Sequence, residues 1–160
     1  MTVAIIYHSV SGHTRQVAEQ LADACDGMLI EVVCRTPYNV VTRYVVGGKR
    51  ALSGEKDEID PAMIDVADFE RIVIGTPVWA RHPTPAINAA VDALRGCEGK
   101  EAAIYATCGA VAGDTIALLQ SALEQKGVRV VGGVVFAQHE LQSEEKQKEL
   151  VSLLGDTCAQ

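Results

Sequence analysis

The chain has 160 residues, a formal net charge of -7 at pH 7 and a hydrophobic content of 48%. This length suits a single domain over residues 1–160 with a sizeable buried core. The acidic balance argues against a nucleic-acid-binding protein, since such proteins usually carry a basic face. No apolar run is long enough for a membrane span, and the N-terminus lacks the basic start and cleavage site of an export signal. We therefore expect a cytoplasmic protein with neither membrane nor nucleic-acid partners.

The cysteines are scattered, odd in number and free of any C-x-x-C pair: Cys25, Cys34, Cys97, Cys108 and Cys158. This spacing indicates neither a zinc site nor a disulfide framework. We expect reduced thiols, which agrees with a cytoplasmic location.

The chain opens with an apolar run over residues 2–7 that is too short for a helix and leads into a hydroxyl-rich loop, residues 8–14. A helical apolar pattern follows at once, so the opening is predicted to be a strand, a tight turn and a helix N-terminus. Hydroxyls and backbone N–H groups at such an N-terminus favour an anion. We predict that this loop holds a phosphate. The alternative is that Ser11 merely caps the helix.

A second β-branched run covers residues 28–33, and Gly27 before it is a candidate C′ residue that ends the first helix. Residues 35–60 are less regular. The sequence there predicts a helix around residues 41–52, followed by a polar surface loop.

Strands and helices alternate along the rest of the chain. Thr84 followed by Pro85 is typical of a helix start, as is Ser143 with acidic residues behind it. The predicted elements are a strand at 72–75 with a turn at 76–79, a helix from 85 to about 94, a strand at 102–106, a helix ending at Gly127, a strand at 128–136 and a last helix after Ser143. Five such alternations predict a three-layer α/β fold with an open, doubly wound, five-stranded parallel sheet.

Three loops rich in hydroxyls, glycine and turn residues follow strands one, three and four of this sheet: residues 8–14, 75–84 and 107–114. In doubly wound sheets, ligands bind beyond the carboxyl ends of the strands at the topological switch point. The first loop has neither the lysine of a P-loop nor a G-x-G-x-x-G pattern, which argues against a nucleoside triphosphate or a dinucleotide there.

The three loops resemble the flavin-binding loops of the flavodoxin family. Ser9-x-Ser11-Gly12-x-Thr14 is similar to the phosphate loop of flavodoxins. The segment that resembles the second flavin loop is Gly75-Thr76-Pro77-Val78-Trp79 with Pro83-x-Pro85. The segment that resembles the third is Thr107-Cys108-Gly109 through Gly113. The resemblance implies FMN as cofactor and a short-chain flavodoxin-like sheet with strand order 2-1-3-4-5, for which flavodoxin is itself a standard example.

The resemblance also implies a role for each matching residue. The FMN phosphate would be held by Ser9, Val10, Ser11, Gly12, His13 and Thr14. One side of the isoalloxazine would be lined by Thr76, Pro77, Val78 and Trp79, with Trp79 as the stacking ring. The other side and the pyrimidine edge would be lined by Thr107, Cys108, Gly109 and Gly113.

The third loop departs from the family pattern, because residues 110–112 are Ala-Val-Ala where flavodoxins commonly carry a stacking tyrosine. One flavin face would then be open and the cofactor less reducing than in a flavodoxin with two aromatic rings. We expect an electron carrier that serves redox partner proteins, as a monomer or homodimer. The alternative is an FMN-dependent NAD(P)H or quinone oxidoreductase whose small-molecule donor or acceptor uses the open face.

Some residues have competing interpretations. His13 could complement the phosphate charge or be a solvated helix-start residue. Arg81 and His82 could contact a nicotinamide phosphate or a partner, or be solvated loop charges. Trp79 could have a core or surface role without flavin.

Cys108 suggests a third function, because a cysteine between a strand and a helix can be the nucleophile of a cysteine hydrolase. Such an elbow needs glycines two residues to either side, and here Ala106 and Ala110 occupy those positions. The other interpretation is a buried thiol beside the cofactor.

Overall fold

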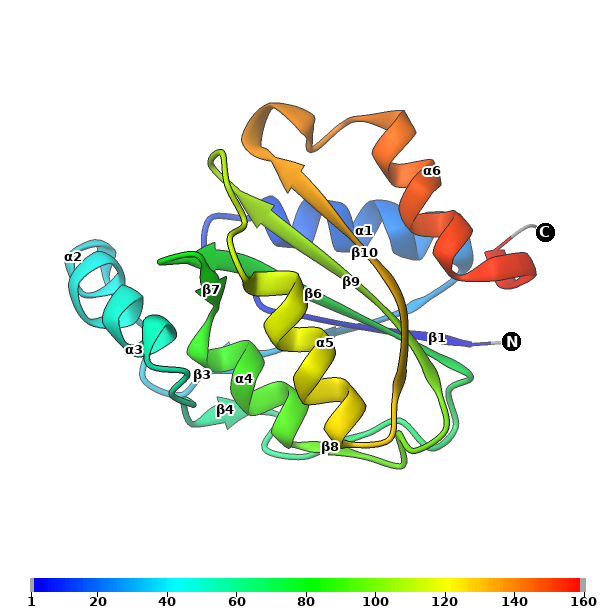
Figure 1. Cartoon of the computed structure of the whole chain (residues 1–160), viewed down its shortest axis with the longest axis horizontal. Coiled ribbons are helices and arrows are strands. Elements are labelled where there is room, and N and C mark those ends of the chain that lie inside the picture. Colours follow the sequence, from blue (N-terminus) through cyan, green and yellow to red (C-terminus); the bar gives the residue numbers. More distant parts are fainter. Residues whose placement is uncertain (1, 159–160) are drawn as a thin grey trace.

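The computed structural model of the protein describes residues 2–158 and shows a central parallel sheet between two layers of helices (Figure 1). The strand order β2-β1-β6-β9-β10 is the predicted order 2-1-3-4-5, and all four pairings are parallel. The strands are β1 (Val3–Tyr7), β2 (Met28–Glu31), β6 (Arg71–Trp79), β9 (Glu101–Cys108) and β10 (Arg129–Ala137). Short strands pair outside this path: β3 (Val33–Cys34) with β4 (Ile59–Asp60), β5 (Ile64–Asp65) with β8 (Leu94–Arg95), and β7 (His82–Pro83) with β6.

Helices cover both faces of the sheet, as Figure 1 shows. One layer holds α1 (His13–Cys25) and α6 (Glu144–Leu153), and the other holds α4 (Pro85–Asp92) and α5 (Thr115–Gln125). Every β1 side chain is buried, with Ile5 facing the α1–α6 layer and Ile6 facing the α4–α5 layer. This two-sided burial is why the strands are apolar runs rather than alternating patterns.

The helix starts predicted from hydroxyl residues are confirmed: Thr84 accepts a hydrogen bond from Ile87 N, and Ser143 accepts one from Lys146 N. The predicted end of α1 is confirmed, with Gly27 at the C′ position, although the left-handed residue is the C-cap Asp26 with φ 50°. Gly27 also serves packing, since a Cβ there would lie 2.7 Å from Ile5 Cδ1.

The predicted turn at residues 76–79 is wrong, because β6 continues through these residues to Trp79. Thr76 and Pro77 still pair with β9, and Val78 and Trp79 pair with β7 in an antiparallel hairpin. The turn comes later, at Ala80 and Arg81, which both adopt positive φ of 50° and 65°. Such a pair matches the twist of a two-residue hairpin loop.

The helix predicted over residues 41–52 is present as α2 (Val40–Thr42), the π-helical turn η1 (Arg43–Gly47) and α3 (Gly48–Leu52). It lies beyond the carboxyl ends of the strands, beside β7 (Figure 1). We call residues 38–52 the covering segment. Its large apolar side chains are mostly exposed: Val40, Val41, Tyr44, Val45, Val46 and Leu52.

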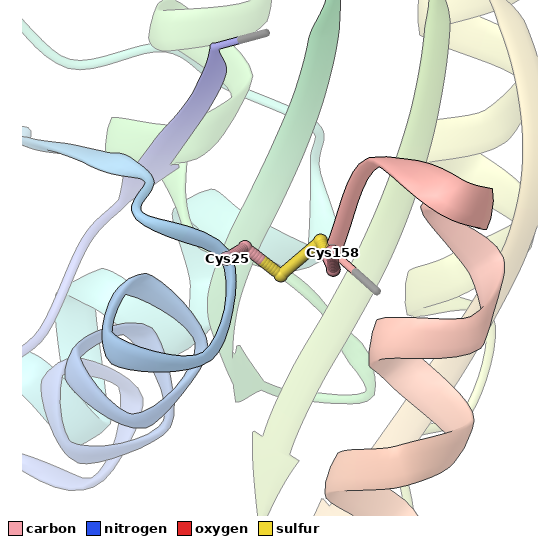
Figure 2. Close-up of a disulfide and its surroundings, with 2 residues drawn as sticks. All are labelled: Cys25 and Cys158. Atoms are coloured by element: carbon pink, nitrogen blue, oxygen red, sulfur yellow. A yellow bond between two sulfur atoms is a disulfide. The ribbon is translucent and has the colours of Figure 1, made fainter. Parts of the chain in front are cut away.

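The expectation of reduced cysteines is contradicted by a disulfide between Cys25 and Cys158, which ties the end of α1 to the C-terminal turn η3 (Gly155–Cys158) (Figure 2). The two cysteines are 133 residues apart in sequence, so spacing alone gave no signal. They meet because α1 and α6 are neighbours that end at the same edge of the sheet. Within residues 2–158, Cys34, Cys97 and Cys108 are free, no cluster of metal-ligating side chains occurs, and no helix is long and apolar enough to cross a membrane.

Candidate functional site

A cavity of about 630 Å³ lies at the carboxyl edge of the sheet, where the three predicted loops meet the covering segment. This volume is within the range of about 300–1,000 Å³ that is usual for small-molecule sites. Its lining residues are Val10, Ser11, His13, Arg43, Tyr44, Gly48, Pro77, Val78, Trp79, Ala80, Thr107, Cys108, Gly109 and Gln138.

The first loop presents an open helix N-terminus to this cavity. Gly12 is the N-cap residue of α1, with φ 92°, and as a glycine it offers no side chain to cap the helix. Ser9 Oγ accepts a hydrogen bond from Arg15 N at 3.2 Å, whereas Ser11 is exposed and lines the cavity. The alternative that Ser11 is the helix cap is therefore wrong, and its hydroxyl is available to a ligand.

Thr14 joins the first loop to the third. Its Oγ1 lies 2.8 Å from Thr107 Oγ1, and its carbonyl accepts a hydrogen bond from the Tyr105 hydroxyl at 2.9 Å. Thr14 is only 1% exposed and is absent from the cavity lining, whereas Thr107 is part of that lining. Thr14 thus holds the first loop to the third from beneath, outside the cavity lining.

In the second loop, Pro77, Val78 and Trp79 line the cavity, but Thr76 does not. Thr76 is fully buried, and its hydroxyl donates to the Pro77 carbonyl at 2.7 Å and accepts from Thr84 N at 3.4 Å. Thr76 therefore holds the β6–β7 hairpin to the start of α4.

Trp79 is held edge-on by two neighbouring rings. Its ring centroid lies 5.3 Å from that of Tyr38 and 6.0 Å from that of His8, both in T-shaped geometry. These contacts fix one side of the indole while the residue also lines the cavity.

In the third loop, Cys108 and Gly109 line the cavity, but Gly113 does not. Gly113 has φ 59°, and a Cβ there would lie 2.3 Å from Arg81 Cβ. The Arg81 carbonyl also accepts a hydrogen bond from Asp114 N. Gly113 and Arg81 thus pack the third loop against the second and lie outside the lining.

Sequence reasoning missed five lining residues: Arg43, Tyr44, Gly48, Ala80 and Gln138. Three of them belong to the covering segment, whose apolar pattern showed a helix but not where it docks. The pair Gly47-Gly48 was the available signal, because glycine destabilises a helix interior and the missing Cβ allows a close approach of other groups.

The cavity suits an anionic ligand although the protein is acidic overall. Of the described residues that line it, none is Asp or Glu, while Arg43 and His13 are basic. Glycines leave bare backbone in and beside the cavity: a Cβ at the lining residue Gly109, or at Gly12 just before α1, would meet nothing within 4 Å, and one at the lining residue Gly48 would meet only Ala80 Cβ, at 4.0 Å. An anion at the α1 N-terminus and a flat group between the loops, as in FMN, fit this arrangement.

The geometry gives no support to cysteine hydrolysis. Burial raises the pKa of the Cys108 thiol, so the thiol is protonated near neutral pH. The histidine that does approach a thiol is His8, whose Nε2 lies 4.0 Å from Cys34 Sγ. Burial lowers the pKa of His8 to about 4 and raises that of Cys34 to about 12, so neither group carries the charge of an activated pair.

Residues 1–144 match the family model of NADPH-dependent FMN reductases. The chain belongs to this family. The resemblance to flavodoxin-like FMN proteins is thereby confirmed, and FMN is the cofactor that family membership supports. None of the curated proteins compared with the chain matches it in sequence.

Solved structures share the fold of this FMN reductase family member over nearly its whole length. A candidate flavoprotein from Bacteroides uniformis is 21% identical with a TM-score of 0.78, covering 94% of this chain and 97% of its own. A flavoprotein from Lactobacillus acidophilus in complex with FMN is 23% identical with a TM-score of 0.69, covering 91% and 99%. An NADH:FMN oxidoreductase in its apo form is 16% identical with a TM-score of 0.66, covering 99% and 88%.

Proposed function

We propose that this protein is an FMN-dependent oxidoreductase that takes electrons from NAD(P)H. The observation that carries the proposal is the cavity at the carboxyl edge, which combines a helix N-terminus with a glycine N-cap, bare glycine backbone and a lining without Asp or Glu. When bound there, the isoalloxazine supplies the hydride and electron chemistry, while the protein supplies binding and orientation. The family match and the NADH:FMN oxidoreductase neighbour support this function.

In this proposal the cavity-lining part of the first loop binds the FMN phosphate. Ser11 offers a hydroxyl, His13 a ring N–H and the start of α1 the positive end of its dipole. The ring system lies between the second loop, at Pro77 to Trp79, and the third loop, at Thr107 to Gly109.

The second candidate is an electron carrier that exchanges electrons with a partner protein. The net charge of -7 favours it, since an acidic surface is complementary to basic redox partners and speeds their association. The two functions share the flavin site and differ only in whether NAD(P)H reaches it directly.

Reconstitution with FMN followed by anaerobic stopped-flow mixing with NADPH separates these functions. Purified protein should bind FMN and quench the fluorescence of Trp79, the single tryptophan. Rapid bleaching of flavin absorbance by NADPH alone identifies a reductase. Bleaching that needs an added reductase protein identifies a carrier. Protein that binds no FMN would refute both.

Assembly and location complete the proposal. We expect a monomer or a homodimer; a homodimer would bury exposed valines such as Val41 and Val45, and the mass in solution with and without FMN tests this. A cytoplasmic location stays a prediction. It requires that Cys25 and Cys158 be reduced in cells, which thiol alkylation of fresh extracts measures.

A further inference from the structure

The covering segment contributes a wall to the cavity that none of the three flavin loops supplies. Arg43, Tyr44 and Gly48 line the same space as Trp79 and Cys108. The segment lies between β3 and β4 in sequence, far from the loops after β6 and β9. Its position at the carboxyl edge is visible in Figure 1.

Specific contacts dock this segment against the site. A Cβ at Gly47 would lie 2.7 Å from Trp79 Cζ3 and 3.4 Å from Tyr38 Cδ1, so Gly47 lets the helix touch the indole directly. Farther along, Arg50 forms an ion pair with Asp57, which also accepts a hydrogen bond from the Tyr38 hydroxyl at 2.9 Å. The Asp57 side chain is only 6% exposed and that of Arg50 31%, so the carboxylate at the centre of this network is shielded from solvent.

The π-helical turn selects the residues that face the cavity. In η1 the Gly48 N–H donates to the Arg43 carbonyl, an i to i+5 hydrogen bond. This spacing places Arg43 and Gly48 one above the other on one side of the helix, with Tyr44 adjacent. Single π-helical turns inside helices occur frequently at functional sites.

The lining side chains of this segment are otherwise unused. Tyr44 is 74% exposed, although a tyrosine ring gains from contact with a flat partner. The Arg43 guanidinium lies 5.0 Å from the Tyr44 ring centroid and forms no ion pair within residues 2–158. An aromatic ring and a cation therefore stand together at the cavity, and apart from their contact with each other neither has an ion-pair or hydrogen-bond partner in the part of the chain that the structure describes.

We infer that the covering segment is the fourth wall of the flavin site, with Tyr44 as its aromatic contact to FMN and Arg43 as its positive charge. The inference rests on the proposed FMN function and names residues of that same site. It replaces the expectation of an open face: the aromatic residue absent from residues 110–112 is supplied by a helix elsewhere in the chain. Arg43 near the reduced, more negative cofactor stabilises it and raises its reduction potential.

The aromatic contact is tested by Tyr44→Ala beside Val45→Ala, a matched control on the same exposed helical turn that does not line the cavity. FMN titration followed by flavin fluorescence should show a dissociation constant raised roughly 3- to 10-fold in Tyr44→Ala and unchanged in Val45→Ala. Tyr44→Phe should restore wild-type affinity. Because Tyr44 is exposed, the free energy of unfolding should change in neither alanine variant.

The position of this wall is tested by placing a larger side chain on it, at Gly48. Gly48 has φ -62°, so a side chain there is free of backbone strain. The leucine side chain of Gly48→Leu should project into the cavity and weaken FMN binding. Lys49→Leu, at the exposed neighbouring position, should leave FMN affinity unchanged.

The charge is tested by the reduction potential of bound FMN. Arg43→Gln should lower it, corresponding to roughly 3- to 5-fold weaker binding of reduced relative to oxidised FMN. Lys49→Gln removes an equal charge from the next helical turn and should shift the reduction potential much less. Wild-type FMN affinity in both Tyr44→Ala and Gly48→Leu would overturn the inference that the covering segment forms a wall of the flavin site. Wild-type protein that binds no FMN would instead overturn the proposed function.

Discussion

Replacing Ser11 by alanine tests the phosphate loop without disturbing the fold. Ser11 is exposed, lines the cavity and forms no side-chain hydrogen bond with the rest of the described chain. Its hydroxyl is therefore free to donate to a phosphate, and a hydrogen bond to a charged group contributes about 1.5–3 kcal/mol. The dissociation constant for FMN should rise roughly 10- to 100-fold in Ser11→Ala, because about 1.4 kcal/mol corresponds to a factor of ten.

Riboflavin is the matched ligand, since it carries the same ring system without the phosphate. Fluorescence titrations with both ligands at one ionic strength should show the loss for FMN alone, and the unfolding midpoint in urea should not move. Thr14→Ala should behave differently, because it breaks the buried contact with Thr107 and should cost about 1–3 kcal/mol of unfolding free energy. Equal losses of FMN and riboflavin in Ser11→Ala would refute phosphate binding by this loop.

Three further predictions concern the scaffold. Gly75→Ala would place a Cβ 2.2 Å from Tyr105 Cζ in a fully buried ring, and overpacking of this kind costs about 1–3 kcal/mol, measurable by urea unfolding; wild-type stability would contradict the packing. Reducing the Cys25–Cys158 disulfide, which closes a 133-residue separation, should lower the free energy of unfolding by about 2–4 kcal/mol. FMN affinity should hold, since the disulfide lies at the end of α1 away from the cavity, and a large loss would contradict this separation. His8 has a pKa of about 4 in the folded protein, below its unfolded value of about 6.5. Its contribution to the free energy of unfolding is therefore fully present above about pH 6.5 and is lost as the pH decreases toward 4, by about 2 kcal/mol at about pH 4.5. His8→Gln should remove that part of the pH dependence, and an unaltered slope would show that other groups cause it.

The sheet could be predicted because its central strands are buried on both faces. Runs such as residues 3–7 and 102–106 are continuously apolar, and no helix of that length would be stable between glycine-rich turns. The position of the three loops at one edge could be predicted as well, because the carboxyl ends of parallel strands meet there. Nine of the fourteen predicted site residues line the cavity there.

The covering segment could not be placed because its docking depends on contacts distant in sequence. Gly47 packs against Trp79, 32 residues later in the chain, and Gly48 approaches Ala80 at the same separation. No local periodicity encodes either pair. The same reason explains the missed disulfide, whose cysteines are brought together by the packing of α1 against α6.

The five predicted site residues that do not line the cavity show how a loop motif combines two tasks. Thr76 binds the start of α4, Thr14 bonds to Thr107, and Gly113 packs against Arg81. Ser9 and Gly12 complete this group by bonding Arg15 N and by starting α1.

A motif aligned by sequence cannot separate residues that touch a ligand from residues that hold the loop, because both types are fixed by the same turn. The two types of residue are separated by measuring how a substitution changes the free energies of ligand binding and of unfolding. Substitution of a lining residue such as Ser11 should change ligand affinity at constant stability, whereas substitution of a loop-holding residue such as Thr14 should change stability first. Loss of affinity in Thr14→Ala is therefore evidence of phosphate contact only where it exceeds the loss measured for riboflavin.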